Sequence, residues 1–288
     1  MEYNKDDYIK LLLNFAESGS LSMVKNLVEE KNIDASAADK VGCTALHKSA
    51  SSGHIDIVRY LLSKGVNIDS KIECNNPKLS GITPVLYAVN SGHHHVAKFL
   101  IEQGADTSVV VNGLNLLDVA VDSDNPSVIG LILEKGFSVE QCFSSNLTPL
   151  ARALSKGKCE SVKFLLEIGA NYKISGPQDD RSPLYYAVQE SSECTELLLK
   201  HVETKEGKGR MIEYINSNHL PMMRTALHLA CFEFNYKTVK VLLQYGADPS
   251  IQDAEGLLPY DLITSIGDIH VGNQIKLLLK GSDKEYNR

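Results

Sequence analysis

The stretch Gly42–His47, with the sequence Gly-Cys-Thr-Ala-Leu-His, returns in altered form along the chain. Its threonine, or the residue that stands in its place, recurs at positions 44, 83, 115, 148, 182, 225 and 258. The successive spacings are 39, 32, 33, 34, 43 and 33 residues. A recurring period of this length indicates a chain built from stacked copies of one supersecondary unit.

A second motif follows these copies: a branched residue, two spacers, a leucine pair and then a glycine. Examples are Val58–Gly65, Val162–Gly169 and Val239–Gly246. In the first motif, threonine suits a helix N-cap, and proline suits the first helical position, where no N–H donor is needed. A glycine such as Gly53 permits the left-handed turn that ends the first helix. Each repeat is therefore predicted to form two short helices, whose apolar faces become buried only when repeats stack.

Together the two motifs resemble the ankyrin repeat family, whose pattern runs G-x-T-P-L-H-x-A-A-x-x-G-H and then V-V-x-L-L-L-x-x-G-A-D. The resemblance covers nearly the whole chain and implies an all-α solenoid of stacked helix-turn-helix units with β-hairpin fingers. We expect a single domain over residues 1–288. Its eight repeats are expected at approximately residues 6–38, 39–71, 78–109, 110–142, 143–174, 178–203, 220–252 and 253–281.

Two spacings are long and indicate insertions at approximately residues 71–80 and 203–219. The first is polar and contains a proline, which predicts an extended finger or loop. In the second, the first half is predicted to be a loop and the second half a short helical or strand-like piece. Insertions in solenoids often lie at the binding face. A tolerated insertion without function is the alternative, because lengthening a surface loop costs little free energy.

The net charge and the scattered cysteines indicate which classes of partner and which cellular compartment to expect. The net charge is −7, from 29 Lys and Arg against 36 Asp and Glu, which disfavours nucleic acid and anionic membrane surfaces as main partners. No secretory signal is expected near the charged start, and no apolar stretch approaches the length of a membrane span. We therefore expect a cytoplasmic protein, with nuclear entry left open. The six scattered cysteines are expected to be free thiols.

Repeats six and seven depart from the pattern in their side chains. The resemblance places hairpin tips and first helices along a concave groove, where exposed aromatic residues and methionines would form an adaptable apolar patch for a protein partner. The alternative is that Phe234 and Met223 pack beneath the neighbouring insertion. The predicted partner-binding residues are Tyr185, Tyr186, Glu190, Met222, Met223, Phe232, Glu233 and Phe234.

Acidic residues outnumber basic ones, nine to five, at the positions expected to face the groove. The excess predicts a basic or mixed-charge partner, and the alternative is a solvated face. The counted residues are Asp39, Asp122, Asp124, Asp179, Asp180, Glu190, Glu233, Asp253 and Glu255 against Lys40, Lys48, Arg152, Lys156 and Arg181.

The sequence contains no recognised catalytic or metal-binding motif. The run His93–His95 lacks accompanying ligands at metal-site spacing, and Gly207–Arg210 does not have the spacing of a nucleotide-binding loop. His47 and His228 belong to the repeated motif, where a structural bond to backbone is expected. We therefore expect no enzyme activity, no cofactor and no metal.

The predicted function is a non-catalytic protein–protein interaction scaffold or adaptor, acting as a monomer and binding a partner segment in its groove. Two alternatives stay open. One is a host-directed effector or the substrate-recognition fragment of a larger protein. The other is a regulatory domain that binds a small molecule or nucleotide, which the acidic groove disfavours.

Overall fold

The computed structural model describes residues 4–76, 79–142, 146–177, 179–218, 221–263 and 268–286. Contacts divide the chain into two compact units. The first runs to Ser138, and the second comprises Val139–Cys142 and the chain from Asn146 onward. The single domain expected from the sequence stays a prediction, and each unit is described by itself.

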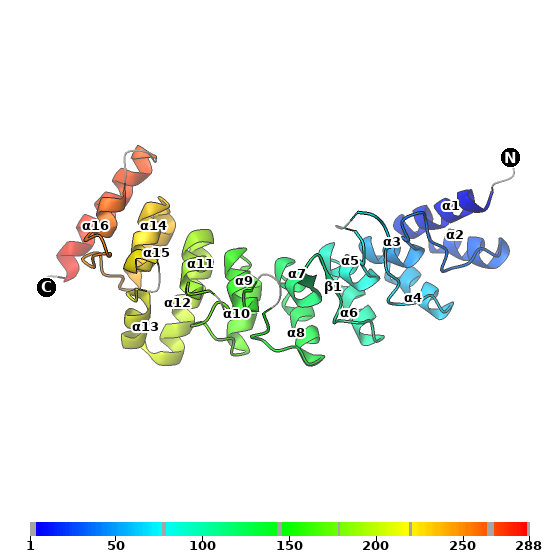
Figure 1. Ribbon diagram of the computed structural model, residues 1–288, viewed down its shortest axis with the longest axis horizontal. Helices are drawn as coiled ribbons and strands as arrows, with labels where there is room; N and C mark the ends of the chain where they lie inside the picture. Colours follow the sequence, from blue (N-terminus) through cyan, green and yellow to red (C-terminus); the bar gives the residue numbers. More distant parts are fainter. Residues whose placement is uncertain are drawn as a thin grey trace. The chain divides into compact units, whose positions relative to one another are not determined.

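The first unit consists of helix pairs in two rows (Figure 1). Helices α1, α3, α5 and α7 contact one another in sequence and form one row, while α2, α4, α6 and α8 form the other. Strands β1 and β2 form an antiparallel finger in which Val110 lies opposite Asn115. The elements are α1 (Lys5–Glu17), α2 (Leu21–Lys25), the π-helix η1 (Asn26–Glu30), α3 (Ala45–Ser51), α4 (Ile55–Ser63), α5 (Pro84–Asn90), α6 (His94–Glu102), β1 (Val110–Val111), β2 (Leu114–Asn115), α7 (Leu116–Asp122) and α8 (Pro126–Glu134).

The second unit has the same two rows (Figure 1). Helices α9, α11, α14 and the short η3 form one row, and α10, α12, α15 and α16 form the other. Helix α13 packs against α12. The elements are α9 (Pro149–Ser155), α10 (Cys159–Glu167), α11 (Pro183–Glu190), α12 (Ser192–Glu206), α13 (Lys208–Ile215), η2 (Pro221–Met223), α14 (Ala226–Phe232), α15 (Tyr236–Gln244), η3 (Pro259–Leu262) and α16 (Ile269–Tyr286).

The start and stop signals of the repeat act as predicted. The hydroxyl of Thr148 accepts the N–H of Ala151 at 3.2 Å, and Pro149 occupies the first turn of α9. Gly53 ends the first helix of its repeat with φ 79°. This left-handed conformation favours glycine because a Cβ atom clashes there.

The apolar core of each unit lies between its two rows of helices. Leu46 and Leu61 are fully buried in the first unit, as are Leu150 and Leu165 in the second. Burying one such side chain stabilises a fold by about 1.5–3 kcal/mol. A single helix pair contributes few of them, so neighbouring repeats must stack for the fold to be stable.

The two insertions are ordered differently. Residues 71–76 and 79–82 belong to an extended finger, as expected, in which Ile72 donates its N–H to the carbonyl of Ile82 at 3.1 Å. Pro77 and Lys78 lie outside the described residues. The prediction of a loop in the first half of residues 203–219 is wrong, because helix α12 continues through this segment to Glu206. Val202, fully buried, anchors this extension. The second half is helical, as α13.

The insertion preserves a ladder of bonds between successive loops. The N–H of Asn171 donates to the carboxylate of Glu140 at 2.6 Å. In the same way, the N–H of Asp248 donates to the side-chain oxygen of Asn216 at 2.8 Å. Asn216 directly follows α13. The inserted helix therefore returns the chain to the position that the next repeat needs.

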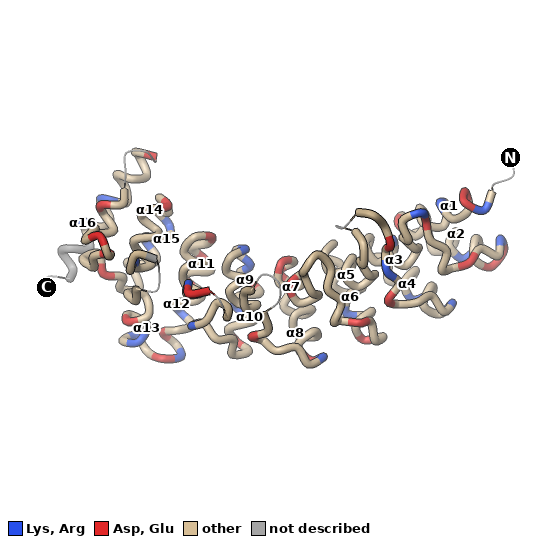
Figure 2. The backbone as a smooth tube through the Cα atoms, in the orientation of Figure 1, with Lys and Arg blue, Asp and Glu red and all other residues tan. Residues whose placement is uncertain are grey.

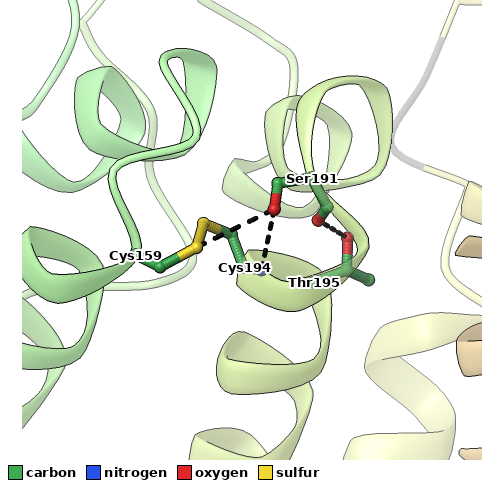
Figure 3. Close-up of a disulfide and its surroundings, with 4 residues drawn as sticks. All are labelled: Cys159, Ser191, Cys194 and Thr195. Atoms are coloured by element: carbon green, nitrogen blue, oxygen red, sulfur yellow. Dashed lines mark hydrogen bonds between the residues drawn. A yellow bond between two sulfur atoms is a disulfide. The ribbon is translucent and has the colours of Figure 1, made fainter.

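The prediction of six free thiols is wrong for two of the cysteines. Cys159, at the start of α10, and Cys194, in the first turn of α12, form a disulfide between adjacent repeats (Figure 3). Their Cα atoms lie 5.4 Å apart, although the two residues are separated by 35 positions in the sequence. The repeat pattern in the sequence contains no signal that predicts this pairing.

Among the helices in the described parts of the chain, none is both long and apolar enough to cross a membrane.

Candidate partner-binding surface

Three of the predicted partner-binding residues are large, apolar and exposed. Met222 is 43% exposed, Met223 56% and Phe232 51%. The methionines belong to the turn η2, and the phenylalanine ends α14. We call these three residues the Met–Phe patch. Exposed apolar side chains that gather on one surface are typical of binding sites.

The two methionines have an unusual backbone. Met222 has φ 66° and Met223 has φ 55°, both in the left-handed region. Bulky residues avoid this region, and residues held in it tend to occur at functional sites. The carbonyl of Met222 accepts the N–H of Ala254 at 2.8 Å, so the finger of the next repeat fixes the turn.

Arg224 joins the methionine turn to Phe232. It follows Met223 in the chain, and its guanidinium lies 5.9 Å from the centre of the Phe232 ring. The same group bonds the buried carboxylate of Asp253 at 3.1 Å and lies 3.9 Å from Glu255. These contacts hold the cation beside the Met–Phe patch and leave the apolar side chains facing solvent.

Tyr186 does not join the exposed patch, so the expectation of two exposed tyrosines is wrong for this residue. It is only 7% exposed, and its hydroxyl donates to the carboxylate of Asp179. Arg181 bonds the same carboxylate at 2.8 Å and lies over both tyrosine rings, 5.3 Å from Tyr185 and 5.0 Å from Tyr186. Tyr185 is half-buried. The tyrosines therefore form a polar cluster with this ion pair.

The ionisation of the cluster follows from its geometry. Burial by itself raises the pKa of Asp179, but hydrogen bonds from Arg181 and Tyr186 outweigh it and hold the pKa below its usual value. Burial and the bond to Asp179 raise the pKa of the Tyr186 hydroxyl. At neutral pH, the carboxylate is therefore charged and bound by its neighbours.

Phe234 is not part of the exposed patch that the sequence predicted. It is half-buried, and a Cβ atom built on Gly272 of α16 would lie 3.2 Å from its ring. The side chain therefore packs against the last helix. Glu190 and Glu233 are exposed, as expected, at the ends of α11 and α14.

Three of the carboxylates counted in the predicted acidic excess have bonding partners within the fold. Acidic and basic residues are interspersed along both units (Figure 2). The carboxylate of Asp39 accepts the N–H groups of Val41 and Cys43 within its own finger, at 3.0 and 2.9 Å. Asp179 and Asp253 are bound by arginines. These bonds hold the fingers in shape, and the basic or mixed-charge partner expected from the sequence stays a prediction.

A polar hollow of about 720 Å³ lies between the finger at 173–182 and the inserted helix α13. Arg181, Arg210 and Glu213 line it, with Glu206 and Tyr214. Arg210 bonds Glu213 at 2.7 Å, and Lys173 bonds Glu206 at 2.9 Å. The sequence located the insertion but could not show the hollow, because one of its walls belongs to another repeat.

The repeated histidines are structural, as predicted. The Nε2 atom of His47 lies 3.2 Å from the carbonyl oxygen of Ile82, and that of His228 lies 3.1 Å from the carbonyl oxygen of Leu257. Each imidazole thus bonds the finger of the next repeat. Over the residues that the structure describes, no group of three or more His, Cys, Asp or Glu side chains is arranged to hold a metal ion.

The sequence matches the family model "Ankyrin repeats (3 copies)" over residues 2–72, 69–142 and 150–253. Among curated proteins, it is 28% identical over 166 residues to the palmitoyltransferase AKR1 of Lachancea kluyveri, covering 55% of this chain and 22% of that protein. It is 36% identical over 95 residues to the 26S proteasome non-ATPase regulatory subunit 10 of Dictyostelium discoideum, covering 33% and 39%. The chain thus spans well under half of the length of these relatives.

Two solved structures are similar to this chain. The human ASB11 ankyrin repeat domain matches with a TM-score of 0.54 and 20% identity, covering 92% of this chain and 96% of that one, which indicates a shared fold. A chain of the Bdellovibrio bacteriovorus complex of the predatory endopeptidase Bd0816 with the immunity protein Bd3460 matches with a TM-score of 0.57 and 32% identity. This match covers 66% of the present chain and 97% of that chain.

Proposed function

Because this chain belongs to the ankyrin repeat family, we propose that it is a non-catalytic protein-interaction adaptor, which binds a segment of a partner protein at the Met–Phe patch. The observation that carries the proposal is the exposure of Met222, Met223 and Phe232 on a turn that the next repeat holds in a left-handed conformation. A turn whose backbone is fixed before binding reduces the entropy lost on binding.

The surroundings of the patch suggest the chemistry of the partner. Glu233 is exposed next to Phe232, and Glu255 lies near Arg224. Such a surface suits a segment with a large apolar residue between basic ones. The apolar anchor would supply most of the affinity, and the charges would mainly set orientation and association rate. The complex that contains a similar chain supports a role in protein binding.

We further propose that the adaptor acts in the cytoplasm.

The test is affinity purification from native lysate with three forms of the protein. The wild type is compared with Met223→Ala/Phe232→Ala and with a control, Val110→Ala/Ile168→Ala, which trims side chains that are 55% and 43% exposed at other sites. Tyr186 is a poor target, because its loss would also disturb Asp179.

A partner bound through the patch should be retained by the wild type and the control and lose at least about 30-fold in affinity with the patch variant, as expected for a binding hot spot. A partner retained equally by all three forms would move the site elsewhere. Failure of the wild type to retain any protein would count against the adaptor itself.

A further inference from the structure

The turn between α11 and α12 is shorter than the equivalent turns. One residue, Ser191, separates these helices. Three residues separate α3 from α4, α5 from α6, α7 from α8, α9 from α10, and α14 from α15. The sixth repeat therefore lacks two residues where the pattern has a glycine followed by histidine or a similar polar residue.

In three other repeats, a polar side chain from this region bonds the preceding repeat. The Nε2 atom of His54 lies 2.9 Å from the carbonyl oxygen of Glu17. His95, in the first turn of α6 directly after the turn, makes the same kind of bond to the carbonyl of Gly53 at 3.1 Å. In the seventh repeat, the amide of Asn235 reaches the carbonyl of Val188 at 3.5 Å. These bonds link successive repeats at their turns.

At the short turn, the disulfide takes the place of such a bond (Figure 3). Ser191 caps α12 by accepting the N–H of Cys194 at 3.2 Å, and its hydroxyl lies 3.8 Å from the sulfur of Cys159. Thr195 donates to the carbonyl of Ser191 at 2.8 Å. The turn is thus ordered around the sulfur pair, which joins repeats five and six.

We propose that Cys159 and Cys194 form a reversible oxidation site, which substitutes for the missing turn residues and sets the rigidity of the joint between repeats five and six. Oxidation by a small disulfide such as oxidised glutathione forms the Cys159–Cys194 bond, and two molecules of the reduced thiol are released. In the cytoplasm proposed above, disulfides are usually transient and redox-sensing.

The unequal exposure of the two sulfurs sets the order of reduction by a dithiol. Cys194 is fully buried and Cys159 only partly, so the reductant's thiolate attacks the sulfur of Cys159. The disulfide breaks, and Cys194 leaves as a thiolate near the N-terminus of α12, where negative charge is favoured, before taking a proton. The second thiolate of the dithiol then releases Cys159 and closes the dithiol into a cyclic disulfide.

The joint lies beside the surface that the partner is proposed to use. A Cβ atom on Gly157 would lie 3.4 Å from the Cγ atom of Glu190, so the end of α11 rests on the turn of the preceding repeat. Helix α11 in turn packs against α14, which carries Phe232. The effect on partner binding rests on the proposed function, whereas the oxidation site does not.

The first test locates the bond and measures its effect on the intact chain. Protein treated with oxidised glutathione is alkylated, digested without reductant and analysed by mass spectrometry, which should yield a Cys159–Cys194 linked peptide. Dithiothreitol should release both alkylatable thiols and lower the melting temperature by about 5–10 °C. Amide exchange around the start of α12 should become faster by about tenfold or more.

The controls separate the bond from general effects of the reductant. Cys159→Ser should melt at the lower temperature in both conditions, and Cys74→Ser, at a partly exposed cysteine in the other unit, should respond like the wild type. If Cys159→Ser fails to fold, the wild-type labelling and exchange still decide. Thiols at 159 and 194 that remain alkylatable after oxidation, or unchanged exchange after reduction, would overturn the proposal. Neither measurement requires a partner, so the adaptor function fails or succeeds separately.

Discussion

Replacing His228 with alanine tests whether the repeated histidine holds adjacent repeats together. The imidazole is fully buried. Its Nδ1 atom accepts the N–H of Thr225 at 3.2 Å, and its Nε2–H donates to the carbonyl of Leu257 at 3.1 Å. This pattern requires the neutral ring with its proton on Nε2. The bonds connect the start of α14 to the finger of the next repeat.

The expected loss of stability follows from the groups that remain after the substitution. The N–H of Thr225 becomes a buried donor without its partner, which costs about 1–3 kcal/mol. The carbonyl of Leu257 keeps the N–H of Asp253 at 2.9 Å, so its loss is closer to one ordinary bond, about 0.5–1.5 kcal/mol. With some relaxation around the vacated ring, the total is about 2–4 kcal/mol, or roughly 5–10 °C in melting temperature.

Thermal and urea unfolding of the wild type and His228→Ala measure this loss. His270→Ala is the matched control, because that histidine is exposed on α16. The control should change stability by no more than about 0.5 kcal/mol. Equal stability of His228→Ala and His270→Ala would refute the argument that the imidazole joins the repeats.

The same variants test how stability depends on pH. Burial lowers the pKa of His47 and of His228, and the raising effect of their carbonyl partners is smaller. A lowered pKa means that the unfolded chain binds the proton first, so this stability is complete above about pH 6.5 and is lost as the pH falls through the folded-state pKa. Urea midpoints at pH 7.5 and 5.5 should differ less for His228→Ala than for the wild type, while His270→Ala retains the wild-type difference.

Two further substitutions test the fold locally. A Cβ atom on Gly176 would collide with the backbone carbonyl of Asn146, so Gly176→Ala should lower the free energy of unfolding by about 1–3 kcal/mol in urea. The control Gly209→Ala, with open space around the added methyl group, should be neutral or stabilising. A neutral Gly176→Ala would contradict the packing of that finger. Asn115 accepts the N–H of Asp118 at 2.8 Å at the start of α7, so Asn115→Ala should cost about 1–2 kcal/mol in thermal melts, and Asn115→Ser should restore part of it if capping is the cause.

The exposure of the candidate site could be predicted only in part. Phe232 and Phe234 are two residues apart, yet one faces solvent and the other packs against α16. Tyr186 is kept from solvent by its hydrogen bond to Asp179, which lies in the finger that precedes helix α11. A repeat pattern places such residues near a groove, but their exposure depends on neighbouring elements that the pattern does not describe.

By itself, the sequence determined the family and a chain of successive repeats, each built from two short helices. These features follow from signals that act within a few residues: a cap such as Thr148, a proline at the first helical turn, and a turn glycine such as Gly53. Tertiary structure alone decided the continuation of α12, the hollow beside α13 and the pairing of Cys159 with Cys194. Each depends on contacts between repeats, which bring together residues too distant in the chain for local signals to relate.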